Sequence, residues 1–182
     1  MATRARERLL ATADELFYSE GVRAVGVERL LEVSGVGRAS FYRHFSSKED
    51  LALAVLRSRD ERWRAWLEQA VTARGGAPLA IFDALAERFA SSEFRGCAFI
   101  NAMIEDTDLD SPVYRLAAEH KQAVAAYIAD LLAEAGHPES RQLAQQFLML
   151  MDGAHVTAQR IRSAAPALQA KAIAEVLLAR HP

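Results

Sequence analysis

Apolar residues recur at helical spacing along most of the chain, and no stretch alternates strictly between apolar and polar positions. Alanine and leucine are abundant, whereas the β-branched residues that favour strands are sparse. The first predicted helix runs from about Thr3 to Ser19 and carries an apolar stripe on one side. This pattern predicts an all-α protein with about nine helices. The stripe of the first helix consists of Leu9, Leu10, Ala13, Leu16 and Phe17.

Glycine, proline and serine residues mark where the following helices begin and end. The longest helix starts after Ser46 or Ser47 and continues without glycine or proline to about Arg74. Its middle, residues 57–64, is so rich in charge that we expect it to cross solvent between two bodies. We therefore expect a three-helix head at residues 1–50 and a second helical domain, a bundle, at 51–182. The other helices are expected at about 27–34, around 41–45, and at 79–91, 97–106, 112–136, 139–162 and 166–180.

The stretch Val33–Leu51 has the pattern of two short helices around a tight turn, followed by the start of the long helix. Gly35 lies where the first of these helices must end, because glycine enters the left-handed conformation without steric cost. Phe41 and Phe45 are four residues apart and share one helix face, which we expect to be buried. Val36 is expected to lie in the seam between the two helices.

The remaining residues of the second short helix are mostly polar and are expected to face solvent. No Asp or Glu lies between Glu32 and Glu49, so this face is predicted to carry only cationic and hydrogen-bonding groups. Such a face is typical of the recognition helix of a helix-turn-helix, which enters the major groove of double-stranded DNA. The predicted DNA-binding residues are Arg38, Ser40, Tyr42, Arg43, His44 and, at the start of the next helix, Lys48.

The sequence contains the motif Y-x-H-F-x-x-K-E-x-L, formed by Tyr42, His44, Phe45, Lys48, Glu49 and Leu51. With the turn glycine, it makes Gly21–Leu51 resemble the DNA-binding head of TetR-type transcriptional repressors. The resemblance implies a homodimer that binds a palindromic DNA operator and is released by a small-molecule effector. One departure is Gly26, which stands where the family usually has a Ser or Thr that opens the second helix and contacts a phosphate.

The net charge of −2 argues against a non-specific DNA-binding protein, which would be strongly cationic. Residues 1–50 hold eight Lys or Arg and eight Asp or Glu, so the head has no net charge. A protein that reads the groove needs positive charge only locally. Here that charge lies at the amino-terminal end and on the predicted recognition helix, so the distribution is compatible with sequence-specific binding.

The segment Phe147–Met151, F-L-M-L-M, is apolar around the whole helix rather than along one stripe. Such a helix must be covered on more than one side, either by the chain's own core or by a second copy of the chain. The resemblance favours the second copy, with the last two helices of each subunit at the interface. The candidate dimer-interface residues are Phe147, Met151, Ile173, Val176 and Leu177.

Several apolar side chains lie on helices of the second domain that are expected to meet. Apolar walls with few polar groups describe a small-molecule pocket, and they describe an ordinary core equally well. The resemblance favours an effector pocket, for which the lining candidates are Phe82, Phe89, Phe99, Met103, Tyr127 and Phe147. Scattered polar candidates are Asn101, Glu105, His120, Gln146 and His155.

Other chemistries have little support in the sequence. His120 and His155 do not lie at a metal-ligand spacing with each other or with Glu105 or Asp106, so neither a metal nor another cofactor is expected. Cys97 begins a helix but is expected to be inert rather than a redox sensor. No phosphate loop or nucleophile elbow is present, so we do not expect an enzyme. A helical enzyme or carrier and a ligand-free scaffold dimer are the remaining alternatives.

The cellular location follows from what the chain lacks. Charged residues interrupt the amino-terminal segment, and no run of eighteen uncharged residues occurs, so neither a signal peptide nor a membrane span is expected. A single cysteine forms no intramolecular disulfide and suits the reducing cytoplasm.

Overall fold

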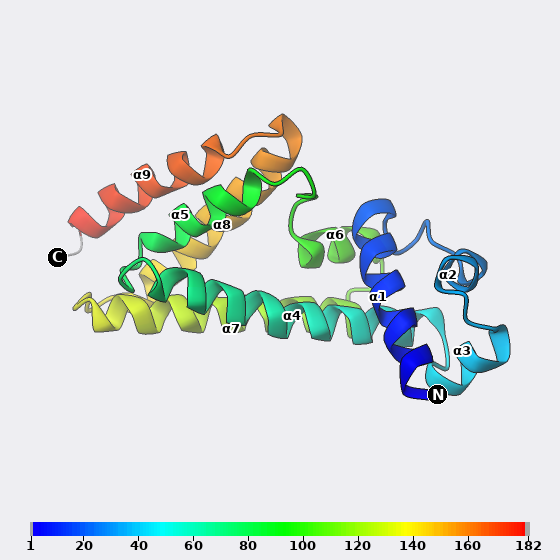
Figure 1. Cartoon of the computed structure of the whole chain (residues 1–182). Coiled ribbons are helices and arrows are strands. Elements are labelled where there is room, and N and C mark those ends of the chain that lie inside the picture. The colour runs from blue at the N-terminus through cyan, green and yellow to red at the C-terminus, as the bar shows by residue number, and fades with distance from the viewer. Residues whose placement is uncertain (1, 181–182) are drawn as a thin grey trace. The chain divides into compact units, whose positions relative to one another are not determined.

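The computed structural model describes residues 2–180, with the backbone alone for Ala2 and Thr3. The described residues form nine α-helices and no strand (Figure 1), which confirms the all-α prediction. Apart from the short helix before Phe45, every helix begins and ends within two residues of its predicted bounds. The helices are α1 (Ala2–Glu20), α2 (Val27–Ser34), α3 (Arg38–His44), α4 (Lys48–Thr72), α5 (Ala80–Phe89), α6 (Ala98–Glu105), α7 (Pro112–Glu134), α8 (Ser140–Ile161) and α9 (Ala165–Arg180).

The chain divides into two compact units. The first unit contains the described residues up to Glu61 together with Ala98–Ala117, and the second contains Arg62–Cys97 and the described residues from Ala118 onward. The division falls within α4, inside the charged segment that was expected to cross between two bodies. The domain boundary at residue 50 stays a prediction, and residues 1 and 181–182 of the two predicted domains lie outside the described part. That α6 packs with the head was not predicted.

The core of the first unit is built from α1, α2, α3 and the start of α4. Gly35 ends α2 in the left-handed conformation (φ +62°, ψ +26°), as predicted. Phe41 and Phe45 are both buried, but Phe45 lies just beyond α3 with extended backbone. Its N–H still donates to the Phe41 carbonyl at 2.9 Å, which returns its ring to the same core. The prediction that both rings face inward is therefore confirmed, whereas the prediction that both belong to the helix is wrong.

The turn between α1 and α2 is held from two sides within the first unit. The backbone N–H of Arg23 donates to Oε2 of Glu105, at the end of α6, at 2.8 Å. The Lys48 amino group donates to the Val22 carbonyl oxygen at 3.0 Å. Gly21 adopts a φ of +93°, and a Cβ on this residue would lie only 3.0 Å from the Glu105 carboxylate. The contacts of Glu105 join α6 to the first unit.

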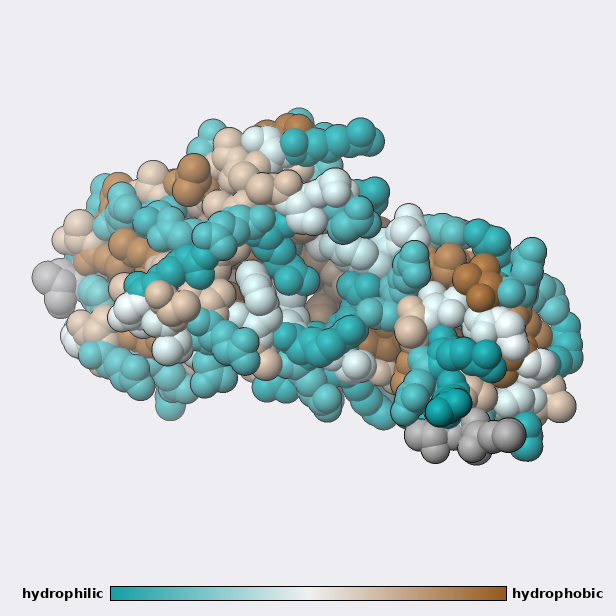
Figure 2. All heavy atoms as spheres, viewed as in Figure 1, coloured by the Kyte–Doolittle hydropathy of each residue, from teal (hydrophilic) through white to brown (hydrophobic). Residues whose placement is uncertain are grey.

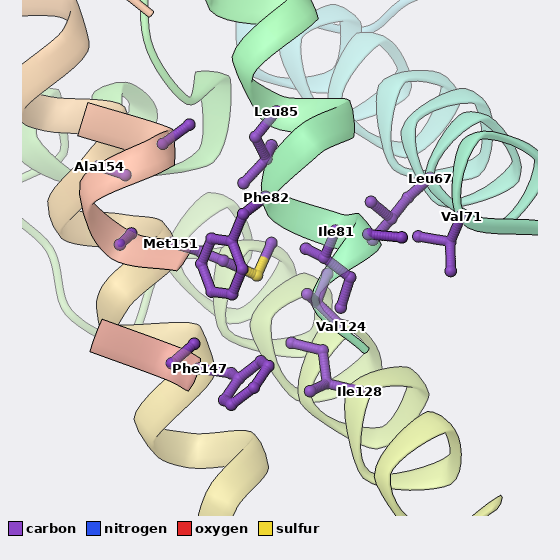
Figure 3. Close-up of a cluster of buried hydrophobic side chains, with 14 of the residues drawn as sticks. Leu67, Val71, Ile81, Phe82, Leu85, Val124, Ile128, Phe147, Met151 and Ala154 are labelled. Atoms are coloured by element: carbon purple, nitrogen blue, oxygen red, sulfur yellow. The ribbon is translucent and has the colours of Figure 1, made fainter. Parts of the chain in front are cut away.

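The core of the second unit lies between α5, α8 and α9, with further side chains from α4 and α7. Figure 3 shows apolar side chains from these helices converging, including Phe82 of α5 and Phe147 of α8. The centroids of these two rings are 5.4 Å apart, and both side chains are fully buried. Buried alanines of α9 complete this core, because their small side chains let the helix pack closely against α5 and α8.

Candidate nucleic-acid interface

Helix α3 has one buried side and one exposed side. Phe41 has no solvent exposure and fixes the buried side, whereas the next residue, Tyr42, is 49% exposed. Arg38 and Arg43 are exposed, and Ser40 and His44 are half-buried. Arg43 and His44 lie in the last turn of the helix, where positive charge interacts favourably with the helix dipole. The exposed side therefore presents cationic and hydrogen-bonding groups from a helix that is anchored by its aromatic residue.

The exposed side of α3 carries no Asp or Glu of its own, as predicted, but a carboxylate from the preceding helix reaches it. The Arg38 guanidinium forms an ion pair with Glu28, which lies in the first turn of α2. Hydrogen bonding and charge attraction from Glu28 raise the pKa of Arg38 above its ordinary value, with a smaller contribution from Tyr42. The contact with Glu28 was not predicted, because this carboxylate comes from the preceding helix and is brought to α3 by the turn at Gly35.

Lys48 is positioned by the fold rather than left in solvent. It is the first residue of α4, is half-buried, and its amino group donates to the Val22 carbonyl oxygen. The residue before it, Ser47, caps α4, because its hydroxyl oxygen accepts a hydrogen bond from the Asp50 N–H at 3.1 Å. An ammonium group has three N–H donors, so the contact with Val22 leaves Lys48 able to contact a second acceptor.

Both helices of the predicted helix-turn-helix begin after a glycine. Gly26 precedes α2 and Gly37 precedes α3, each with extended backbone and without a side-chain cap. The missing cap at Gly26 matches the departure from the family pattern that the sequence indicates. The amino-terminal N–H groups of α2 therefore have no hydroxyl partner from residue 26.

The residues predicted for an effector pocket are divided between the two units. Phe82, Phe89 and Phe147 are buried in the core of the second unit, and Tyr127 is half-buried against it. Phe99 and Met103 lie on α6, which belongs to the first unit.

His155 and Gln146, two of the polar pocket candidates in the second unit, differ in their hydrogen bonding. The Nδ1 atom of His155 lies 2.8 Å from the Met151 carbonyl oxygen, and its ring packs edge-on against Phe89 with centroids 4.9 Å apart. Burial is the main cause that lowers the pKa of His155 to about 4. The Oε1 atom of Gln146 is buried and has no hydrogen-bond partner in the part of the chain that the structure describes.

The candidate interface residues on α8 and α9 differ in exposure. Phe147 and Met151 are enclosed by the chain's own core, whereas Ile173 and Val176 of α9 are both 52% exposed. Leu177 is half-buried. Figure 2, drawn from the same side as Figure 1, shows apolar residues at the surface over α9. Other exposed apolar residues on these two helices are Met149, Val156, Ile161 and Leu168.

The described residues contain neither a candidate metal site nor a helix that could cross a membrane. Within residues 2–180, no three His, Cys, Asp or Glu side chains are grouped so that they could hold a metal ion. None of the described helices combines the length and the apolar character that a membrane crossing requires.

Two parts of the chain match known protein families. Residues 9–55 match the bacterial regulatory proteins of the tetR family, and residues 76–173 match the C-terminal domain of LmrA/YxaF-like transcriptional regulators. Among curated relatives, the transcriptional regulator TcmR of Streptomyces glaucescens is 36% identical over 97 residues, which are 51% of this chain and 42% of TcmR. The matches to TcmR and to the other first curated relatives span between 30% and 66% of those proteins.

Solved structures extend the match over almost the whole chain. A TetR-family transcriptional regulator from Streptomyces coelicolor is 34% identical, with 98% of this chain and 96% of that chain covered and a TM-score of 0.87. The reduced form of NemR from E. coli is 26% identical, with 93% and 95% covered and a TM-score of 0.80. Both the head and the helical remainder therefore have counterparts in the same proteins, and the chain belongs to the TetR family of bacterial regulatory proteins.

Proposed function

We propose that the protein is a cytoplasmic repressor that binds a double-stranded DNA operator and leaves it when a small-molecule effector binds. The exposed side of α3 carries this proposal, because Phe41 anchors the helix from behind while polar side chains cover its front. Arg43 and Arg38 can pair with guanine edges or phosphates. Tyr42 and Lys48 are suited to contact the phosphate backbone, and such contacts set the register of a protein on DNA.

Arg43→Ala tests the groove contact. Arg43 is exposed and has no ion-pair partner within residues 2–180, so its removal leaves the fold intact. An arginine that pairs with a guanine contributes about 1–3 kcal/mol, so we expect operator binding to weaken roughly tenfold to a hundredfold. Fluorescence anisotropy with the duplex that flanks the protein's own gene measures this effect at a fixed salt concentration. Arg115→Ala removes the same charge from an exposed position on α7, outside α3 and the helices of the proposed dimer, and is expected to bind like the wild type. Equal binding by Arg43→Ala and the wild type contradicts the groove assignment.

We propose further that the operator-binding form is a homodimer built through α8 and α9. Ile173 and Val176 support this proposal, because large apolar side chains that are half exposed on one helix are typical of a surface that a partner covers. A two-fold dimer would present two copies of α3 to half-sites about 34–36 Å apart, and its two-fold symmetry would match a palindromic operator. Phe147 and Met151, which the chain itself encloses, would then support the interface from behind.

The double variant Ile173→Ala with Val176→Ala tests the dimer. Burial of apolar surface contributes roughly 25 cal/mol per Å², so loss of these two side chains from each subunit is expected to raise the dimer dissociation constant at least about tenfold. Analytical ultracentrifugation across a concentration series measures this constant. Glu175→Gln changes an exposed polar side chain on a different face of the same helix and is expected to leave the constant unchanged. A double variant that dimerises like the wild type contradicts this interface.

The effector is expected to bind in the second unit beside its aromatic residues. Gln146 supports this expectation, because a buried amide oxygen without a donor is rare in folded proteins. A largely apolar molecule with one hydrogen-bond donor would satisfy it. Such a ligand changes DNA affinity only if it binds the DNA-bound and released conformations with different affinities. A thermal-shift screen followed by release of the operator duplex tests both properties.

A further inference from the structure

The ion pair between Glu28 and Arg38 joins the two helices of the helix-turn-helix on their exposed side. The residues are ten positions apart, and the left-handed turn at Gly35 brings them together. Nη2 of Arg38 donates to both carboxylate oxygens of Glu28. The side chains remain exposed, at 73% for Glu28 and 55% for Arg38. The pair therefore lies at the surface where α3 is proposed to meet DNA.

The ion pair between Glu28 and Arg38 is expected to add little to the stability of the fold. Exposed ion pairs contribute little to folding, because solvent screens their charges and two long side chains lose conformational freedom. A carboxylate at this position also repels phosphates, so Glu28 weakens the attraction of the surface for DNA of any sequence. A contact that adds little stability and opposes general DNA attraction needs another explanation.

The geometry of the ion pair explains how Glu28 could act on DNA recognition. A guanidinium group carries five N–H donors in a fixed plane, and Glu28 engages only those of Nη2. The carboxylate thus restricts the orientation of the plane while the N–H groups of Nη1 and Nε lie outside the ion pair. An arginine that pairs with a guanine must present two N–H groups to O6 and N7 in one plane. A restrained guanidinium reaches this arrangement with a smaller loss of conformational freedom than an unrestrained one.

We propose that Glu28 determines the DNA specificity of this protein by positioning Arg38 to read a guanine and by lowering affinity for unrelated sequences. This inference rests on the proposed function of α3. Glu28 itself is not expected to contact a base, because a positioning residue acts through the side chain that it holds. The partner is therefore an operator with a guanine opposite Arg38 in each half-site.

Glu28→Gln tests the inference against Glu32→Gln as its matched control. Glu32 lies on the same helix with a side chain that is 76% exposed, but it pairs with Arg29 rather than with α3. Both variants remove one negative charge, so both are expected to bind an unrelated duplex somewhat more tightly and with a steeper salt dependence. Only Glu28→Gln is expected to lower the ratio of operator affinity to unrelated-duplex affinity, by about tenfold.

The readout is the dissociation constant for the duplex that flanks the protein's own gene, for single-base variants of it and for an unrelated duplex. Glu28→Gln is expected to relax the preference at the same base position as Arg38→Ala, and the double variant to resemble Arg38→Ala alone. If Glu28→Gln keeps both the affinity ratio and the base preference of the wild type, the inference is overturned. If the wild type itself does not distinguish its flanking duplex from the unrelated one, both the proposed function and this inference fail.

Discussion

Phe41→Ala is expected to lower the free energy of unfolding of the first unit by about 3–5 kcal/mol, the usual cost of removing a buried phenylalanine. Phe41 is fully buried in the core formed by α1 to α4. The centroid of its ring lies 5.1 Å from the ring centroid of Tyr42 and 6.3 Å from that of Phe45. The cavity left by alanine would remove the main anchor of a helix only seven residues long. DNA binding is expected to be lost with it, because an unanchored α3 cannot hold its polar side chains in register.

Tyr42→Ala is the matched control for this prediction. Tyr42 is adjacent in sequence but half exposed, so its loss is expected to cost about 1 kcal/mol or less, mainly from the edge-to-face contact with Phe41. Amide hydrogen exchange measures the two effects locally, because it resolves the opening of the first unit from that of the second. Protection in α1, α2 and α3 should fall in Phe41→Ala and remain in Tyr42→Ala. Similar protection in both variants contradicts the proposed anchor.

The sequence predicted the head well because its determinants are local. Gly35 requires the left-handed turn, and the spacing of Val36 and Phe41 requires that they share a core with the stripe of α1. Phe45 shows the limit of such reasoning, since periodicity predicts the direction of its side chain but not the residue at which the helix ends. The structure buries the ring with an extended backbone at this position.

Contacts between residues distant in sequence could not be predicted from periodicity. Glu105 binds the backbone of Arg23 across 82 positions, and this contact exists only because α6 packs with the head. Glu28 reaches Arg38 through a turn whose geometry, rather than its sequence, sets the distance between the helices. Neither contact leaves a repeating pattern in the sequence.

The segment Phe147–Met151 was ambiguous for another reason. A helix that is apolar on all sides carries no signal for which side faces its own core. In the structure, Phe147 and Met151 face inward, whereas Met149 is 72% exposed. The core-helix interpretation therefore describes one side of this element, and a helix covered by a partner stays a prediction for the side that carries Met149.

The second unit is expected to lose about 3 kcal/mol of stability between pH 6.5 and pH 4 because of His155. The Met151 carbonyl oxygen can only accept a hydrogen bond, so Nδ1 of the neutral ring carries the proton and donates to it. Burial lowers the pKa of His155 to about 4, and the positive charges of Lys121 and Arg88 act in the same direction. In the unfolded chain a histidine titrates near pH 6.5.

The sign of the effect follows from which state binds the proton. Above pH 6.5 the histidine is neutral in both states, so it does not make stability depend on pH. As the pH falls below 6.5, the unfolded chain takes up a proton that the folded protein excludes, and stability declines by up to about 1.4 kcal/mol per pH unit. The decline from this residue ends near pH 4, where the folded state is protonated as well.

Urea denaturation of the wild type and of His155→Phe at several pH values between 7.5 and 4.5 measures this effect. Trp63 and Trp66 lie in the second unit, so their fluorescence reports its unfolding. Phenylalanine suits the surrounding aromatic residues and cannot titrate. The difference between the two plots of unfolding free energy against pH therefore separates the effect of His155 from that of the other four histidines. Asp106 does not interfere, since its pKa is lowered by its hydrogen bond with Ser111 and its contribution is lost only at more acidic pH. If the wild type and His155→Phe lose stability in parallel as the pH falls, then His155 is not excluded from protonation by burial.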